Sequence, residues 1–235
     1  MGRYLWDEKM IRFMDQAAER SAYYKELASY IEPYISRDSV VCDVGCGLGY
    51  LAAEMSRFCK KVYAVDISEQ VIDCLKLKLE KENITNVEAL CVDVFNWKPR
   101  EQIDATVYCM FGTLDEIEMI GKHLGVKQQF IVRRLAKQHR FRIKEKREHR
   151  YTAQEMMEEL YNAQYTCDYY EMAIHFDQPF RNLEEAVQFF EIYNKSQEKI
   201  SLEDVKNRIE EQDDEEYPYL LPSEKQMGLI CYKMK

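Results

Sequence analysis

The sequence lacks any apolar run long enough to cross a bilayer, and its first ten residues carry charges on both sides of Trp6 instead of an apolar core. We therefore expect neither a transmembrane segment nor a secretory signal peptide. The eight cysteines include no C-x-x-C pair, and several lie inside apolar stretches where a thiol behaves as a small hydrophobe. These features predict a protein of the reduced cytoplasm, with no membrane partner and no metal site.

Glycine- or proline-rich linkers, internal repeats and low-complexity segments are also absent. With 235 residues, of which 46% are hydrophobic, the chain is long enough for one substantial globular core. A net charge of −9 argues against a general nucleic-acid binder, which is normally basic. We therefore expect a single domain over residues 1–235, present as a monomer or a homodimer.

The most informative segment is the run VVCDVGCGLG at residues 40–49. It indicates a β-branched strand that contains an acid, Asp43, and leads into a glycine loop with the spacing G-x-G-x-G. Apolar residues then recur at helical spacing between Leu51 and Phe58. Glycine allows a tight reversal and lets backbone N–H groups approach a ligand with no Cβ in the way. Strand, loop and helix in this order predict the first unit of a nucleotide-type α/β fold.

Two further strands repeat the pattern, and each is followed by an acid. Residues 62–65 lead into Asp66, and residues 87–92 lead into Asp93. Open parallel sheets bind ligands at the carboxyl ends of their strands, and an acid after the second strand is placed to accept hydrogen bonds from ribose hydroxyls. Ser68 is the expected N-cap of the helix that follows the second strand. Three acids in register therefore predict a ligand site at this edge.

This constellation resembles the class I S-adenosylmethionine-dependent methyltransferases, whose first motif reads acid-x-G-x-G-x-G. The resemblance covers residues 40–109. It implies that the glycine loop lies against the methionine part of the cofactor, that Asp66 holds the ribose hydroxyls, and that Asp93 and the backbone N–H of Val94 hold the adenine. The cofactor-binding residues that it implies are Asp43, Gly45, Cys46, Gly47, Gly49, Asp66, Ile67, Asp93, Val94 and Tyr108.

The resemblance also implies the fold. We expect a Rossmann-like α/β sheet of seven strands in the order 3-2-1-4-5-7-6, with strand 7 antiparallel and helices on both faces. Residues 39–135 would form the cofactor-binding core and residues 136–235 the acceptor-side half, with a helical insertion before the last strand. The later strands are expected at residues 103–110, 130–132, 167–176 and 228–232, and helices are expected at residues 152–163, 183–190 and 201–216.

A nicotinamide or flavin enzyme is the main alternative, because its fingerprint G-x-G-x-x-G also begins with two spaced glycines. In that register the third glycine would fall at Tyr50. A bulky ring there hinders the approach of a pyrophosphate to the helix N-terminus. S-adenosylmethionine carries no phosphate, so the methyltransferase interpretation is favoured.

Two apolar stripes predict a pair of helices within residues 1–38, ahead of the first strand. In methyltransferases that act on small molecules, such helices often lie over the active site as a lid. Plain packing on the sheet is the alternative. Tyr4, Tyr23 and Tyr24 are the candidate lid aromatics.

The acceptor is less clear, because the fourth strand is followed by none of the signatures that mark a reaction. The N/D-P-P-Y/F motif, the Pro-Cys pair and a compact acid cluster are all missing there. His175 and Tyr108 are the candidate catalytic bases, since imidazole accepts a proton near neutral pH, although such a histidine also fits a structural role. Cys42 and Cys46, which flank the glycine loop, are candidates for redox sensitivity, with ordinary core or turn residues as the alternative.

Residues 133–150 form a basic run that is diluted by Glu145 and Glu148. This run suits nucleic-acid phosphates, a small acidic substrate, or a solvated hairpin. Three functions therefore stay open. The favoured one is methyl transfer from S-adenosylmethionine to a small, partly apolar acceptor. The others are an RNA or protein methyltransferase that uses the basic run, and a non-catalytic S-adenosylmethionine sensor.

Overall fold

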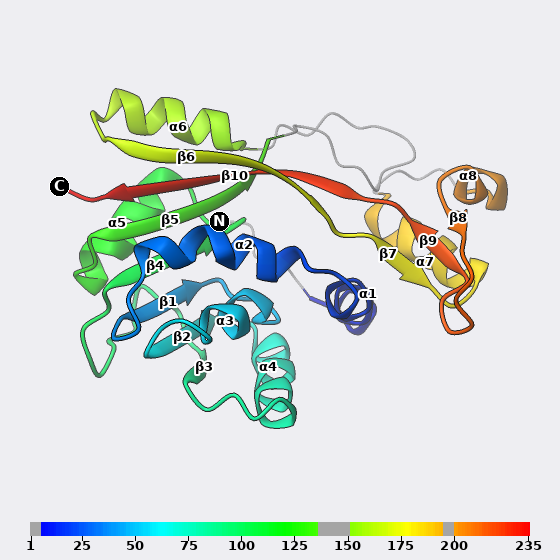
Figure 1. Ribbon diagram of the computed structural model, residues 1–235, viewed down its shortest axis with the longest axis horizontal. Helices are drawn as coiled ribbons and strands as arrows, with labels where there is room; N and C mark the ends of the chain where they lie inside the picture. Colours follow the sequence, from blue (N-terminus) through cyan, green and yellow to red (C-terminus); the bar gives the residue numbers. More distant parts are fainter. Residues whose placement is uncertain (1–5, 136–150, 195–199) are drawn as a thin grey trace.

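The computed structural model describes residues 6–135, 151–194 and 200–235 (Figure 1). Its main feature is a seven-stranded sheet in the order β3-β2-β1-β4-β5-β10-β6. Only β10 runs antiparallel to its neighbours, β5 and β6. This arrangement confirms the predicted order 3-2-1-4-5-7-6. The strands are β1 (Val40–Val44), β2 (Lys61–Asp66), β3 (Val87–Cys91), β4 (Ala105–Cys109), β5 (Gln128–Arg134), β6 (Cys167–His175) and β10 (Glu224–Lys233).

Helices cover both faces of this sheet (Figure 1). One face packs against α2 (Tyr23–Ile31), α3 (Tyr50–Met55) and α4 (Glu69–Lys81). The other packs against α5 (Leu114–Leu124) and α6 (Ala153–Asn162). Side chains alternate between the two faces along each strand, so that neighbouring residues of one strand enter different cores. This alternation decides on which face of the sheet each side chain lies at the carboxyl ends of the strands.

Local sequence signals fix the starts of α5 and α6. Each begins with a capping box, formed by Thr113 with Glu116 and by Thr152 with Glu155. In a capping box the hydroxyl and the carboxylate each satisfy a backbone N–H that the helix itself leaves free. Gly125 ends α5 in the left-handed conformation, with φ of 67°. These helix ends are therefore readable from the sequence.

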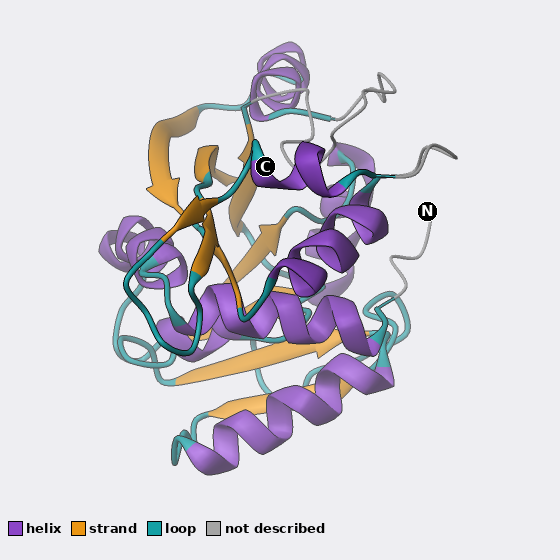
Figure 2. Cartoon of the chain, turned by 90° about the vertical axis from the view of Figure 1, so that its right-hand side faces the viewer, coloured by secondary structure: helices purple, strands orange, loops and turns teal. Residues whose placement is uncertain are grey.

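A small three-stranded sheet in the order β7-β9-β8 lies beyond the end of the main sheet, within an insertion between β6 and β10 (Figure 1). We refer to residues 176–223 as the insertion. It contains β7 (Gln178–Phe180), α7 (Leu183–Tyr193), α8 (Leu202–Lys206), β8 (Glu210–Glu211) and β9 (Tyr219–Leu221). Figure 2 views the molecule from this end.

The helix predicted over residues 201–216 is wrong after Lys206. The run from Glu210 to Glu216 is acidic without a single basic residue, so it cannot form the opposite-charge pairs that stabilise an exposed helix. Asp214 instead accepts hydrogen bonds from the backbone of Glu216 and Tyr217 in a turn. The chain returns there as the β8–β9 pair.

The first helix, α1 (Glu8–Glu19), belongs to the insertion more than to the main sheet. The Phe13 ring is fully buried, with its centroid 6.1 Å from that of Phe180 and 5.2 Å from that of Phe189. Arg20 reaches Asp214 at 2.9 Å. Aromatic packing and a charged contact therefore fasten α1 to a segment more than 150 residues away in the chain.

The two N-terminal helices were predicted as a lid, and the structure separates their roles. Tyr23 and Tyr24 of α2 pack with Phe176 and Tyr50 in the core. This agrees with the alternative of plain packing on the sheet; a lid role for these two tyrosines stays a prediction, and Tyr4 lies outside the described residues. Within the described ranges no helix is long and apolar enough to cross a bilayer.

Replacing Phe13 with Ala should lower the free energy of unfolding by roughly 3–5 kcal/mol, because a buried ring is lost and its cavity stays. Urea unfolding followed by circular dichroism measures this change. Met119→Ala is the control, since Met119 is 58% exposed and its loss should leave stability nearly unchanged. Equal stability of the two variants would contradict the assigned packing of α1.

Candidate functional site

The glycine loop after β1 is held against the end of β2. The backbone N–H groups of Gly45 and Cys46 both donate to the Val65 carbonyl, at 2.8 and 3.1 Å. Gly47 donates its N–H to Asp66 Oδ2 at 2.9 Å. Three loop glycines have positive φ, a conformation that side chains with a Cβ rarely adopt. The loop therefore has a fixed shape, in which Gly47 and Gly49 are buried and the N–H groups of Gly45, Cys46 and Gly47 are bonded within the protein.

Asp66 forms several hydrogen bonds at the end of β2. Its Oδ1 accepts from the Ser68 N–H at 2.9 Å, while its Oδ2 holds Gly47. Its backbone carbonyl accepts from Val92 N at 2.9 Å, which joins the ends of β2 and β3. Next to it, the Ile67 side chain is 47% exposed. An exposed apolar group beside an acid suits a ligand with both a hydroxylated and an apolar part.

Asp43 is the unusual group of this site, because its carboxyl is buried with only 1% exposure. Its Oδ2 has no hydrogen-bond partner among the described residues. The pKa of Asp43 is raised to about 7 because burial and the nearby Asp66 raise it more than the hydrogen bond from the Ala52 N–H lowers it. Two neighbouring carboxyls without a cation between them create a strongly negative point at the end of β1.

The third predicted acid, Asp93, is exposed just after β3. Its two oxygens accept from Phe95 N at 3.0 Å and from Asn96 Nδ2 at 3.1 Å. Val94 beside it is buried. The structure thus brings the ends of β2 and β3 together, and Asp93 shapes the turn at their edge.

Two aromatic rings that the sequence did not single out as site residues cover the glycine loop. A Cβ on Gly45 would collide with the Phe111 ring, and a Cβ on Gly47 would lie 3.2 Å from the Trp6 ring. Arg133 Nη2 donates to the Phe111 carbonyl at 2.9 Å and so fixes the chain after β4. The only sequence signals for these contacts were the position of Phe111 after a strand and the place of Trp6 in an apolar stripe.

The two predicted catalytic residues are not brought together. Tyr108 is fully buried and faces the α5 side of the sheet, opposite to Asp43. His175 has a side chain that is 72% exposed, and its Nδ1 lies 3.6 Å from Asp177 Oδ1. The structure argues against both as catalytic bases, and against a cofactor contact by the Tyr108 side chain. The parity of β4 explains the Tyr108 error, because its neighbours Val107 and Cys109 face the other side.

Cys46 donates its thiol to the Gly47 carbonyl at 3.6 Å. Burial raises the pKa of Cys46 well above its ordinary value. A thiol that stays protonated reacts slowly with oxidants, so the structure favours the turn role for Cys46 over redox sensitivity. No group of three or more potential metal ligands occurs in the part of the chain that the structure describes.

Comparison with known proteins agrees with this geometry. Residues 41–123 match a sequence family described as a methyltransferase domain. An uncharacterized protein of Haemophilus influenzae is 27% identical over 126 residues, which make up 52% of this chain and 46% of that protein. A probable cobalt-precorrin-6B C(15)-methyltransferase (decarboxylating) of Methanocaldococcus jannaschii is 41% identical over 56 residues, 24% of this chain and 31% of that protein. The chain thus spans less than half the length of these relatives.

Solved structures share the fold. A proposed methyltransferase from Bacillus halodurans aligns with a TM-score of 0.55 at 14% identity, over 92% of this chain and 98% of its own. The YcgJ protein of Bacillus subtilis aligns with a TM-score of 0.54 at 11% identity, over 90% and 99%. Residues 41–123 thus match a methyltransferase domain, and the chain shares the fold of these solved structures, in keeping with the predicted resemblance to the class I S-adenosylmethionine-dependent superfamily.

The residues present fit the cofactor of that superfamily. S-adenosylmethionine carries a sulfonium and an ammonium group, and both are positive. The negative point made by Asp43 and Asp66, with an unpartnered oxygen on Asp43, calls for such a charge. The glycine loop reverses the chain beside these two carboxyls in a conformation that side chains with a Cβ rarely adopt. The structure holds these features at one edge of the sheet.

Replacing Asp43 with Asn tests the buried carboxyl. Because the pKa of Asp43 is raised in the folded state, folding binds a proton, and the wild type loses stability as pH rises toward about 7. From about pH 5 to about pH 8 the variant should gain roughly 2–3 kcal/mol of unfolding free energy relative to wild type.

Urea unfolding of both proteins across this pH range measures the gap. It should level off above about pH 7, where the wild-type carboxyl is already ionised in both states. A gap that stays constant with pH would show that Asp43 has an ordinary pKa.

Proposed function

We propose that this protein transfers the methyl group of S-adenosylmethionine to a small organic acceptor that carries negative charge. The proposal depends most on one observation, the neighbouring carboxyls of Asp43 and Asp66 beside the glycine loop. By the resemblance to the superfamily, Asp66 would hold the ribose hydroxyls, and the Val94 N–H and Asp93 would hold the adenine. When bound, the cofactor supplies an electrophilic methyl carbon on a positively charged sulfur.

The work of the chain in this reaction is to bind and align. Asp43 and Asp66 would attract the positive charge of the cofactor and so hold it at the carboxyl end of β1. Phe111 and Trp6 cover the loop with apolar rings and keep water away from it. Arg133 holds the Phe111 backbone in place.

A positive region next to this edge supports an anionic acceptor. Cys109 ends β4 on the same face of the sheet as Asp43, and it pairs in register with Val132 of β5. Two residues further on, Arg134 shares that face. The pKa of Cys109 is raised to about 12, mainly by burial and also by Asp43, while Lys225, Arg133 and Arg134 all act to lower it. Three cations therefore act on the point where the acceptor would meet the methyl group.

The walls of this region are aromatic. Lys225 Nζ lies 4.1 Å from the centroid of the Phe176 ring and 5.7 Å from that of Tyr23. Cations close to ring faces suit a planar organic anion, which binds the charge at one end and packs its apolar part on the rings. This supports a small acceptor with a carboxylate or a similar group.

An RNA or protein acceptor has less support. Arg133, the first residue of the basic run, is buried and holds a backbone carbonyl instead of facing solvent. Residues 136–150, which make up the rest of that run apart from Arg134 and Leu135, lie outside the described residues. The net charge of −9 also disfavours a long polyanion. A sensor without turnover is the remaining alternative, and an assay of methyl transfer separates it from the enzyme.

Cofactor binding is tested by Asp66→Asn, which keeps the shape and removes the charge. We expect S-adenosylmethionine to bind at least about tenfold more weakly, since the ribose contact and part of the attraction for the positive charge are lost. Isothermal titration calorimetry measures this. Asp73→Asn on the solvent side of α4 is the matched control and should bind as wild type does. Unchanged affinity for Asp66→Asn would overturn the ribose assignment.

The acceptor is tested with methyl-labelled S-adenosylmethionine, purified protein and a cell extract separated into small molecules, RNA and protein. We expect label in small molecules that an anion-exchange resin retains. Lys225→Gln should reduce this labelling at least about fivefold by raising the KM for the acceptor, while cofactor affinity stays the same. Label in RNA, in protein or in cationic small molecules would overturn the anionic acceptor, and no label despite cofactor binding would favour the sensor.

A further inference from the structure

The glycine loop, which is expected to contact the cofactor, is covered from outside. Gly47 and Gly49 are buried, and the Trp6 ring lies over Gly47. Leu48 between them is also buried and packs against Ile11 of α1. We refer to Trp6 and α1 together as the cover. A ligand reaches this loop only when the cover moves away from it.

The cover is attached unequally on its two sides. On the insertion side, Phe13 is fully buried among the aromatic rings of that segment. On the loop side, the cluster of buried apolar residues consists, in the described parts of the chain, of Ile11, Leu48 and Val71. The other contact on this side is a polar group around Asp15. The loop side is therefore the weaker attachment and the one at which the cover opens.

This polar group joins three helices. The hydroxyl of Tyr50, the first residue of α3, donates to Asp15 Oδ1 of α1 at 2.6 Å. Lys78 Nζ of α4 lies 3.9 Å from the same oxygen and 2.8 Å from the centroid of the Tyr50 ring. Because Tyr50 directly follows Gly49, the group acts at the end of the glycine loop.

Lys78 holds its amine in an unfavourable place. The side chain is 13% exposed, and its Nζ is buried with no hydrogen-bond partner among the described residues. An ammonium group has three donors, so burial without an acceptor in hydrogen-bond range costs much of its hydration energy. The contact between α1 and α4 therefore contains a charge that opposes it.

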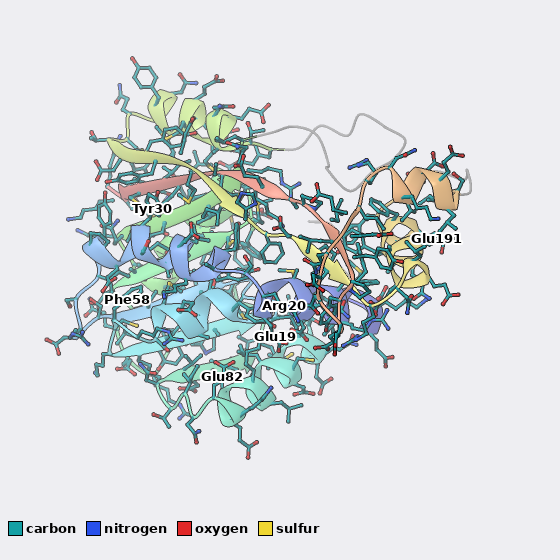
Figure 3. The ribbon with its side chains drawn as sticks, turned by 45° about the vertical axis from the view of Figure 1, so that its right-hand side comes forward. Glu19, Arg20, Tyr30, Phe58, Glu82 and Glu191 are labelled. Carbon is teal, nitrogen blue, oxygen red and sulfur yellow. The ribbon has the colours of Figure 1, made fainter. Side chains whose placement is uncertain are left out.

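The titratable groups that face Lys78 come from each helix packed around it, and they are Tyr50 of α3, Asp15 and Glu19 of α1, and Cys74 and Glu82 of α4 and its C-terminal end. Figure 3 shows Glu19 at the end of α1 and Glu82 at the end of α4. The carboxylates favour the ammonium form, but burial outweighs them and lowers the pKa of Lys78 to about 8.

Opening of the cover would return Lys78 to water, since α1 supplies Asp15 and Glu19 on its outer side. In water the pKa of a lysine is about 10.4. Between about pH 8 and pH 10.4 the closed state therefore binds fewer protons than the open state. A rise in pH through this range favours closure, and protonation at neutral pH favours opening.

We propose that Lys78 controls the cover, which opens to admit the cofactor when this lysine carries its proton and closes when the proton leaves. The proposal rests on the proposed function, because it takes the ligand of the loop to be S-adenosylmethionine. Lys78 is a positioning residue, since it acts on the loop through Tyr50 and Asp15. It makes cofactor exchange dependent on pH.

Fluorine NMR of the intact protein labelled with 5-fluorotryptophan measures the cover without any cofactor. The chain has two tryptophans, Trp6 and Trp97, and Trp97→Phe assigns their signals. We expect Trp6 to exchange with a minor open state whose population falls about tenfold from pH 7 to pH 9. Saturation-transfer and relaxation-dispersion experiments measure this population. Trp97, which packs on Tyr63, should show no such change.

Two variants separate the charge of Lys78 from its packing. Lys78→Met has no charge and should keep the open population low at both pH values. Lys78→Arg stays charged and should keep it high at both. Lys76→Met, at a 56% exposed position of the same helix, is the matched control and should behave as wild type does. Thermal unfolding checks that the variants fold, and Lys78→Met decides the question alone if arginine does not fit.

Absence of a minor Trp6 state at pH 7 would overturn the proposal, and so would an equal pH dependence in wild type and Lys78→Met. Stopped-flow mixing with S-adenosylmethionine then tests entry. The association rate constant should fall about tenfold from pH 7 to pH 9 in wild type, and Lys78→Met should remove this fall. If both proteins show the same rates, the cover does not control entry. Failure of S-adenosylmethionine to bind would overturn the proposed function instead, and the fluorine result would stand.

Discussion

The buried carboxyl of Asp43 is the constraint on which the functional edge depends. It sits in the core beside Asp66 with one oxygen unpartnered, and its pKa is raised to about 7. Such an arrangement is unfavourable for the folded protein alone and becomes favourable when a positive ligand enters. The glycine loop lies beside these carboxyls, and its Gly47 N–H donates to Asp66. A positive group that binds here would offset the unfavourable interaction between the two carboxyls, so the site favours a cationic cofactor.

The second organising feature is the attachment of α1 to the insertion. Phe13 packs among the insertion's aromatic rings, and Gln16 and Arg20 contact its carboxylates. The same helix places Ile11 on Leu48, while Trp6 just ahead of it lies over Gly47. One element therefore joins the cover of the cofactor loop to the insertion. The carboxyls of Asp43 and Asp66 and the positive region near Cys109 lie next to each other. In the proposed function, the first side of the site attracts the cofactor and the second attracts the acceptor.

The sheet could be read from the sequence because its signals are local. Apolar strands followed by acids and the capping boxes at Thr113 and Thr152 depend only on neighbouring residues. The errors arose where distant contacts or strand parity decide. Tyr108 shares its strand with Cys109 but faces the opposite core. Contacts such as Trp6 on Gly47 join residues far apart in the chain, and no spacing rule describes them.

The attachment of α1 to the insertion also sets the order in which parts of the protein fold during synthesis. The ribosome makes α1 first, and its partners Phe180, Glu185 and Phe189 are made more than 160 residues later. Contacts between such distant segments form late, because their loop-closure entropy is offset only once most of the chain is in place. The cofactor half can thus fold around an uncovered loop on the nascent chain. The cover is completed only after synthesis has reached the insertion, so the apolar face of α1 around Phe13 lacks its partner until then.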